Sequence, residues 1–147
     1  MVVDKWVCGE VSFDQKSIII GGSYHKTPVL GSLEFTADLH NNTFITLPVD
    51  KGAVEIVKRI PGVDIYLSGC FGAIVATVFE AKFKRMKVLR VIKGVLEGKS
   101  VYNLAYFGNH CYFVGERGEE VGCVEFFKNP EMDKYYKHGK IEGEESV

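Results

Sequence analysis

The stretch from Ser32 to Phe83 constrains the fold more than any other part of the chain, because its hydrophobic period changes twice. Apolar and polar residues alternate through Val29–Ala37 and again through Thr43–Leu47, as they do in half-buried strands. Apolar residues then recur at helical spacing through Asp50–Ile60. Alternation returns at Val63–Ser68 and near the end of the stretch. The stretch therefore predicts the order strand, strand, helix, strand, strand.

The segments on either side of this stretch add further strands and a second helix. Ser17–Ile20 is an uninterrupted β-branched run, and short apolar runs occur at 104–107, 111–114 and 121–127. Between Phe83 and Leu96, apolar residues repeat at helical spacing. Short turns pair strands antiparallel, and short antiparallel strands remove their open edges best by closing into a barrel. We expect an α+β fold: a small antiparallel β-barrel of about seven strands with two helices packed at its ends.

The length and composition of the chain predict one domain followed by a polar tail. A chain of 147 residues is long enough for a single buried core, and we expect that domain to span residues 1–130. Residues 131–147 carry five acids and few aliphatic residues, which is typical of a partly disordered acidic tail. The predicted elements direct these apolar side chains into one core: Leu33, Phe35, Ile45, Val54, Val57, Ile65, Leu67, Phe79 and Phe83.

The overall composition argues against several classes of function. The formal net charge of −1 gives no global field that would attract nucleic acid or a membrane surface. No apolar run approaches the roughly 18 residues of a membrane span, and the N-terminus does not resemble a signal peptide. The four cysteines lack metal-binding spacing. We therefore expect a cytoplasmic protein with no bound metal and no membrane partner. Since no catalytic motif is present, the sequence leaves enzymatic activity open.

Two loops carry the residues best suited to binding an anion. The first is the predicted helix start at Asp50–Gly52, where Lys51 and free backbone N–H groups would attract negative charge and Gly52 would permit close approach. The second follows a pair of glycines and offers hydrogen-bond donors from His25, Lys26 and Thr27. We expect a small anionic ligand to lie between this loop and the predicted helix start.

A third candidate is the run of positive charge between residues 82 and 93. Six basic residues occur there with no acid among them, so the run could hold phosphate or RNA. The apolar residues between them fall on the core stripe of the predicted helix, whereas nucleic-acid binders place exposed aromatic residues among such charges. A nucleic-acid partner is therefore the less favoured alternative, because such a run is more typical of a solvated helix face.

The segment from Thr43 to Leu67 resembles part of the FMN-binding split barrel, the fold of pyridoxamine-phosphate-oxidase-like and flavin-reductase-like proteins. The resemblance covers residues 17–83 and rests on the order of predicted strands and helix. It implies a homodimeric flavoprotein with oxidoreductase activity, in which FMN carries the electrons. The residues it would place at the cofactor are Lys51 near the phosphate, Gly52 where many members carry a second basic residue, Thr46 at the end of the third strand, and Ser32 beside the flavin ring. A non-catalytic ligand-binding or protein-binding barrel is the alternative interpretation.

Overall fold

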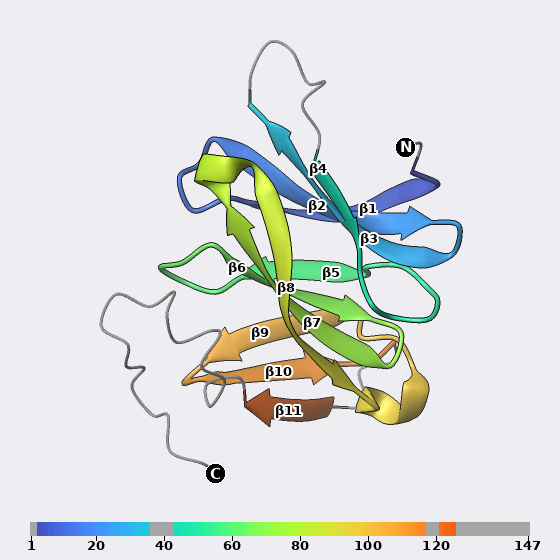
Figure 1. Cartoon of the computed structure of the whole chain (residues 1–147). Coiled ribbons are helices and arrows are strands. Elements are labelled where there is room, and N and C mark those ends of the chain that lie inside the picture. Colours follow the sequence, from blue (N-terminus) through green and yellow to red (C-terminus); the bar gives the residue numbers. More distant parts are fainter. Residues whose placement is uncertain (1–2, 36–42, 117–120, 126–147) are drawn as a thin grey trace.

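A computed structural model describes residues 3–35, 43–116 and 121–125, and this part of the chain is all β (Figure 1). Eleven strands form three antiparallel sheets, and the described residues contain no α-helix. None of the sheets closes into a barrel, so the expected α+β barrel with two helices is wrong. Within the described residues, no helix is long and apolar enough to cross a membrane.

The strands are distributed over the sheets in chain order. The N-terminal sheet contains β1 (Lys5–Val11), β2 (Ser17–Tyr24), β3 (Thr27–Glu34) and β4 (Thr43–Thr46). The central sheet contains β5 (Ile56–Arg59), β6 (Ile65–Cys70), β7 (Ala73–Glu80) and β8 (Arg85–Lys93). The C-terminal sheet has the order β11 (Val121–Glu125), β10 (His110–Val114), β9 (Asn103–Phe107). Two short 3₁₀ turns, η1 (Ala81–Phe83) and η2 (Val95–Gly98), follow β7 and β8.

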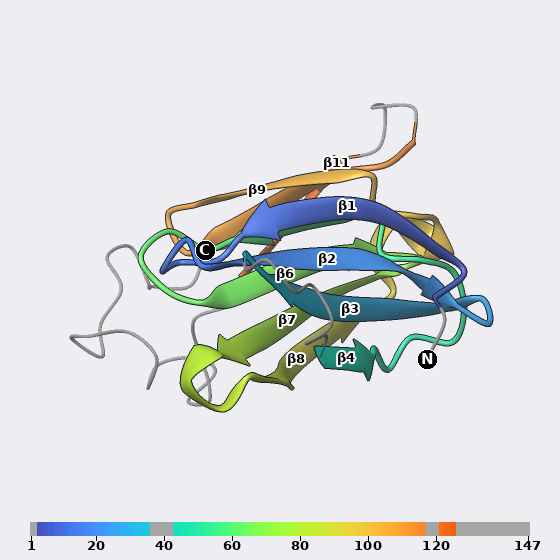
Figure 2. The ribbon, with the colours of Figure 1, turned by 90° about the horizontal axis from the view of Figure 1, so that it is seen from above.

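The three sheets stack as layers, with the central sheet between the other two (Figure 1). Viewed from above, strands of the N-terminal sheet pass over β6 and β7 at an angle (Figure 2). Every residue of β6 is buried, as are all residues of β7 except the last. Both strands are buried because each has a neighbouring layer on both faces, so Tyr66 and Ser68 are buried although alternation would place them on an exposed face.

Two hydrophobic clusters therefore replace the single core expected from the sequence. One lies between the N-terminal and central sheets and includes Val54, Val57 and Phe79. The other lies between the central and C-terminal sheets and includes Ile65 and Leu67. Two of the expected core residues are on the surface instead, and two are only partly buried: Phe35 and Phe83 are 56% and 60% exposed, while Leu33 and Ile45 are half-buried.

The first expected helix is a loop followed by a strand. Residues 50–55 form the loop, and Ile56–Arg59 pairs antiparallel with β6. Pro61 and Gly62, which would end a helix, lie instead in the turn that joins β5 to β6, where Ile60 N donates to Ile65 O at 2.8 Å. A short apolar run is compatible with either a helix or a buried strand, and here the pairing with β6 decides for the strand.

The second expected helix is the long strand β8. A register shift opposite Ala76 and Thr77 leaves Leu89 without a direct partner in β7, which is a β-bulge. Met86 and Val88 face the N-terminal side, whereas Leu89 packs with the cluster on the other side. The extra residue interrupts the alternation of side chains between the two faces of β8. The apolar residues Met86, Leu89 and Ile92 therefore recur every three residues, as they would on one face of a helix. The expected acidic tail, residues 131–147, lies outside the described residues.

Candidate functional site

Two of the predicted ligand-binding loops meet at one end of the sandwich. Gly52 N donates a hydrogen bond to Lys26 O at 2.7 Å, which joins the 50–55 loop to the β2–β3 turn. Val54 N donates to Gly22 O at 3.0 Å and extends this connection. The two loops border a hollow of about 440 Å³ lined by Lys5, Ser23, Lys26, Lys51, Gly52, Ala53, Glu55 and Phe71. We call this the first hollow.

The backbone that shapes the first hollow is unusual at both loops. The β2–β3 hairpin turns through two residues, His25 and Lys26, whose φ angles are 48° and 60°. Tight hairpins need this left-handed conformation, although it costs about 1 kcal/mol or more at a residue other than glycine. Gly52 has a φ of 104°, and a Cβ there would approach Phe71 Cβ to 3.0 Å. A side chain at position 52 would therefore press on the wall of the hollow.

A second, smaller hollow adjoins the first. It measures about 220 Å³ and is lined by Val49, Asp50, Lys51, Phe71, Gly72, Ala73, Lys93, Gly94 and Gly98. Lys51 and Phe71 line both hollows, and Lys51 Nζ lies 4.8 Å from the centre of the Phe71 ring. This cation–π contact lies where the two spaces adjoin, and Phe71 is 38% exposed.

Charge at this end of the molecule is mostly positive. The two hollows are lined by four lysines, Lys5, Lys26, Lys51 and Lys93, against two carboxylates, Asp50 and Glu55. Glu55 is half-buried, and its negative charge raises the pKa of the Tyr102 phenol. The lining of the hollows can therefore neutralise an anion, while Glu55 is placed to accept a hydrogen bond from a hydroxyl or amine of the same ligand.

The remaining sequence-predicted residues do not converge on the first hollow. Ser32 and Thr46 are separated because Ser32 pairs with Ile19 on the core-facing side of the N-terminal sheet, whereas Thr46 pairs with Val29 on the opposite face. Thr27 pairs with Tyr24 at the hairpin, and His25 packs edge-on against the Tyr24 ring at 4.2 Å. Neither His25 nor Thr27 lines the hollow.

The basic run at residues 82–93 is not a single charged face. Lys82 and Lys84 precede strand β8. Within β8, Arg85, Lys87 and Arg90 lie on one face, because they pair with alternate residues of β7, and Lys93 lies on the other. Lys84 Nζ lies 2.9 Å from Glu34 Oε1, and Arg85 Nε lies 2.9 Å from Glu80 Oε1. Arg90 donates to the backbone oxygen of Glu125 at 2.8 Å. Much of the run thus forms ion pairs or hydrogen bonds within the protein. Of its six basic residues, Lys93 is the one that lines the second hollow.

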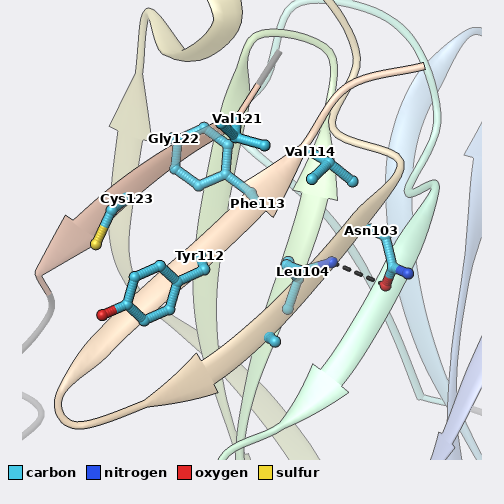
Figure 3. Close-up of a pocket in the computed structure, with 9 residues that line it drawn as sticks. Asn103, Leu104, Tyr112, Phe113, Val114, Val121, Gly122 and Cys123 are labelled. Carbon is cyan, nitrogen blue, oxygen red and sulfur yellow. Dashed lines mark hydrogen bonds between the residues drawn. The ribbon is translucent and has the colours of Figure 1, made fainter. Parts of the chain in front are cut away.

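A third hollow is on the outer face of the C-terminal sheet and has a different character (Figure 3). It measures about 540 Å³, and apart from Asn103 and Tyr112 its lining is apolar. Asn103 Oδ1 accepts a hydrogen bond from Leu104 N at 2.9 Å, so this side-chain oxygen is already used. Val121 is 70% exposed at its rim. A specific ligand site needs a few convergent polar groups, and this face offers an apolar surface instead.

Sequence reasoning missed this apolar face, although alternation gave a signal for it. Tyr112 and Val114 alternate with the buried Cys111 and Phe113, so two large side chains of β10 point outward. Two of the cysteines in the described residues are buried. Burial raises the pKa of the Cys70 and Cys111 thiols to about 12. Among the described residues, no group of three His, Cys, Asp or Glu side chains could hold a metal ion.

These features define the chain as a three-layer all-β protein with a lysine-lined, two-part hollow at one end. No known family model matches the chain, and no curated protein matches it significantly in sequence.

Proposed function

We propose that the protein binds a small phosphate-bearing ligand in the first hollow, between the β2–β3 turn and the 50–55 loop. The observation that carries the proposal is the meeting of Lys5, Lys26 and Lys51 around one space of about 440 Å³. The hydrogen bond from Gly52 N to Lys26 O joins the loops that carry Lys26 and Lys51.

Electrostatics favour an anion over a neutral ligand. Three ammonium groups that share one concave surface repel one another, and a phosphate placed among them relieves that repulsion while accepting their hydrogen bonds. All three lysines are exposed, so each contact is screened by water and salt and contributes modestly. The proposal therefore predicts binding that weakens as ionic strength rises.

FMN belongs to the proposed class of ligand, and the resemblance to split barrels would place its phosphate at Lys51. The residue lies in a loop and not at a helix start, so its side chain and that of Lys26 would carry the attraction without a helix dipole. Oxidoreductase activity and a homodimer remain predictions from the resemblance. Visible absorption of the purified protein tests for flavin, and light scattering tests for the dimer.

Charge reversal at Lys51 tests the proposal directly. Calorimetric titration with inorganic phosphate and with FMN should show that Lys51→Glu weakens binding by about tenfold or more, a change of roughly 1.4 kcal/mol. Lys16→Glu is the matched control, since Lys16 is exposed in the turn before β2, at the opposite end of that strand from Ser23. The proposal is refuted if Lys51→Glu binds as tightly as the parent, or if the parent binds neither ligand.

A further inference from the structure

We infer that the two hollows form one site for an elongated ligand in which two phosphate groups flank a nucleoside, as in the dinucleotide pApA. This inference rests on the proposed function and extends it to the class of ligand. Lys51 and Phe71 line both hollows, so these two side chains lie where the two spaces adjoin. A ligand anchored in one hollow can therefore reach the other by passing over Phe71.

Positive charge is available in both hollows. Lys5 and Lys26 line only the first hollow, and Lys93 lines only the second. Lys51 stands between them with its ammonium group over the Phe71 ring. A ligand with one anionic group would use only one side, whereas two phosphates separated by a nucleoside would use both sets of lysines.

Phe71 supplies the surface on which a planar ring can stack. Phe71 is 38% exposed even though the flanking strands β6 and β7 are almost wholly buried. An exposed aromatic ring between basic residues is the arrangement by which proteins hold nucleotide bases next to their phosphates. Any nucleotide base can stack on an aromatic side chain, so the arrangement predicts binding of nucleotides without selecting one base.

Three glycines line the second hollow and add no side chains to it. Gly72, Gly94 and Gly98 have φ angles of 65°, 75° and 81°. Gly72 N donates to Lys99 O at 2.7 Å, and a Cβ on Gly72 would approach Gly98 Cα to 3.0 Å. The two loops thus touch through their main chains, and no side chain rises from these glycines into the space beside Lys93.

The strained turn beside these glycines supports the assignment. Leu96 and Glu97 both adopt left-handed φ angles, 48° and 52°, between Gly94 and Gly98. Conformations of this kind at residues other than glycine cluster at binding sites, where the surrounding structure holds them. Here they bring Gly98 to the wall of the hollow next to Gly72.

Titrations with inorganic phosphate, AMP and the dinucleotide pApA test the inference. The dinucleotide should bind at least about tenfold more tightly than AMP, since it adds a second phosphate contact. Lys93→Glu should weaken binding of pApA about tenfold more than it weakens binding of inorganic phosphate. Phe71→Leu, which keeps an apolar side chain but removes the flat ring, should weaken AMP and pApA but leave inorganic phosphate within about twofold. Lys16→Glu is again the control, and thermal unfolding of each variant reports whether it is folded.

The outcomes separate the two proposals. Binding of phosphate and AMP with no gain for pApA overturns the inference and leaves the proposed function standing, whereas absence of any binding by the parent refutes the proposed function itself. Equal effects of Lys93→Glu on pApA and on inorganic phosphate also overturn the inference. An eight-nucleotide strand distinguishes the source of the ligand: affinity equal to that of pApA indicates a free dinucleotide, and much tighter binding indicates the end of a longer strand.

Discussion

Truncation of Phe79 should destabilise the protein far more than truncation of Phe35, although both residues are phenylalanines in or next to strands. Phe79 is 5% exposed in the cluster between the N-terminal and central sheets, opposite Met86. A buried phenylalanine removes roughly 150 Å² or more from water, which at about 25 cal/mol per Å² is worth roughly 4 kcal/mol. Phe79→Ala also leaves a cavity between two sheets, so we expect a loss of about 3–5 kcal/mol.

Phe35 provides the matched comparison. Phe35 is 56% exposed, and the backbone hydrogen bond from its N–H to Lys16 O at 2.8 Å survives replacement by alanine. Less than half of the side-chain area is buried and no closed cavity forms, so Phe35→Ala should cost about 1 kcal/mol or less. This corrects the larger cost that alternation alone would assign to Phe35.

Urea unfolding followed by Trp6 fluorescence measures both variants, with free energies extrapolated linearly to water. The difference between the variants should be about 2 kcal/mol or more. Phe79→Leu is a control that keeps most of the apolar volume and should lose roughly half as much as the alanine variant. A difference below about 1 kcal/mol, or a greater loss for Phe35→Ala, would show that the burial described above is wrong.

Two further predictions concern titratable groups. Cys123 is exposed while burial raises the pKa of the other three thiols to about 11–12, so a disulfide reagent at neutral pH should modify Cys123 first. Equal rates for two or more thiols would contradict this. Burial and a 2.8 Å hydrogen bond to Asp64 raise the pKa of Tyr66 above its usual 10.0, so the folded state keeps a proton that the unfolded state loses. Stability should therefore fall as pH rises above about 10, and Tyr66→Phe should reduce this fall while costing about 1 kcal/mol at neutral pH. An unchanged pH dependence in the variant would refute the reasoning.

The sequence indicated the strands in which apolar and polar residues alternate and those made of β-branched residues. It did not indicate the two strands whose apolar residues recur at helical spacing. In β8, the bulge at Leu89 shifts the outward and inward positions by one residue, and a pattern search reads the shifted spacing as helical. In residues 50–60, the decisive interaction is the pairing of Val57 with Ser68, which lies across a turn and cannot be seen in local periodicity. The third layer was missed for a related reason, because alternation does not say which sheet will cover a strand.

Of the candidate site, only the two loops that carry Lys26 and Lys51 could be predicted from the sequence. Lys26 and Lys51 were expected to lie near each other, and the hydrogen bond from Gly52 N to Lys26 O confirms that their loops meet. Lys5, Phe71 and Lys93 come from three different parts of the chain and join them through the register of the sheets. None of these three has a local pattern that distinguishes it from an ordinary surface residue.

The layered arrangement should determine which parts of the protein unfold locally and which unfold only with the whole molecule. Because β6 and β7 are interior strands of a sheet that is covered on both faces, loss of either outer sheet leaves one of their faces still packed. Their backbone amides should exchange with deuterium only through global unfolding, whereas the three-stranded C-terminal sheet can detach as a smaller cooperative unit. Phe71 lies in the turn between these two most protected strands. The proposed ring-stacking surface is thus anchored to the strands expected to exchange most slowly, whereas Lys5 and Lys26 belong to the N-terminal sheet and Lys51 to the loop before β5.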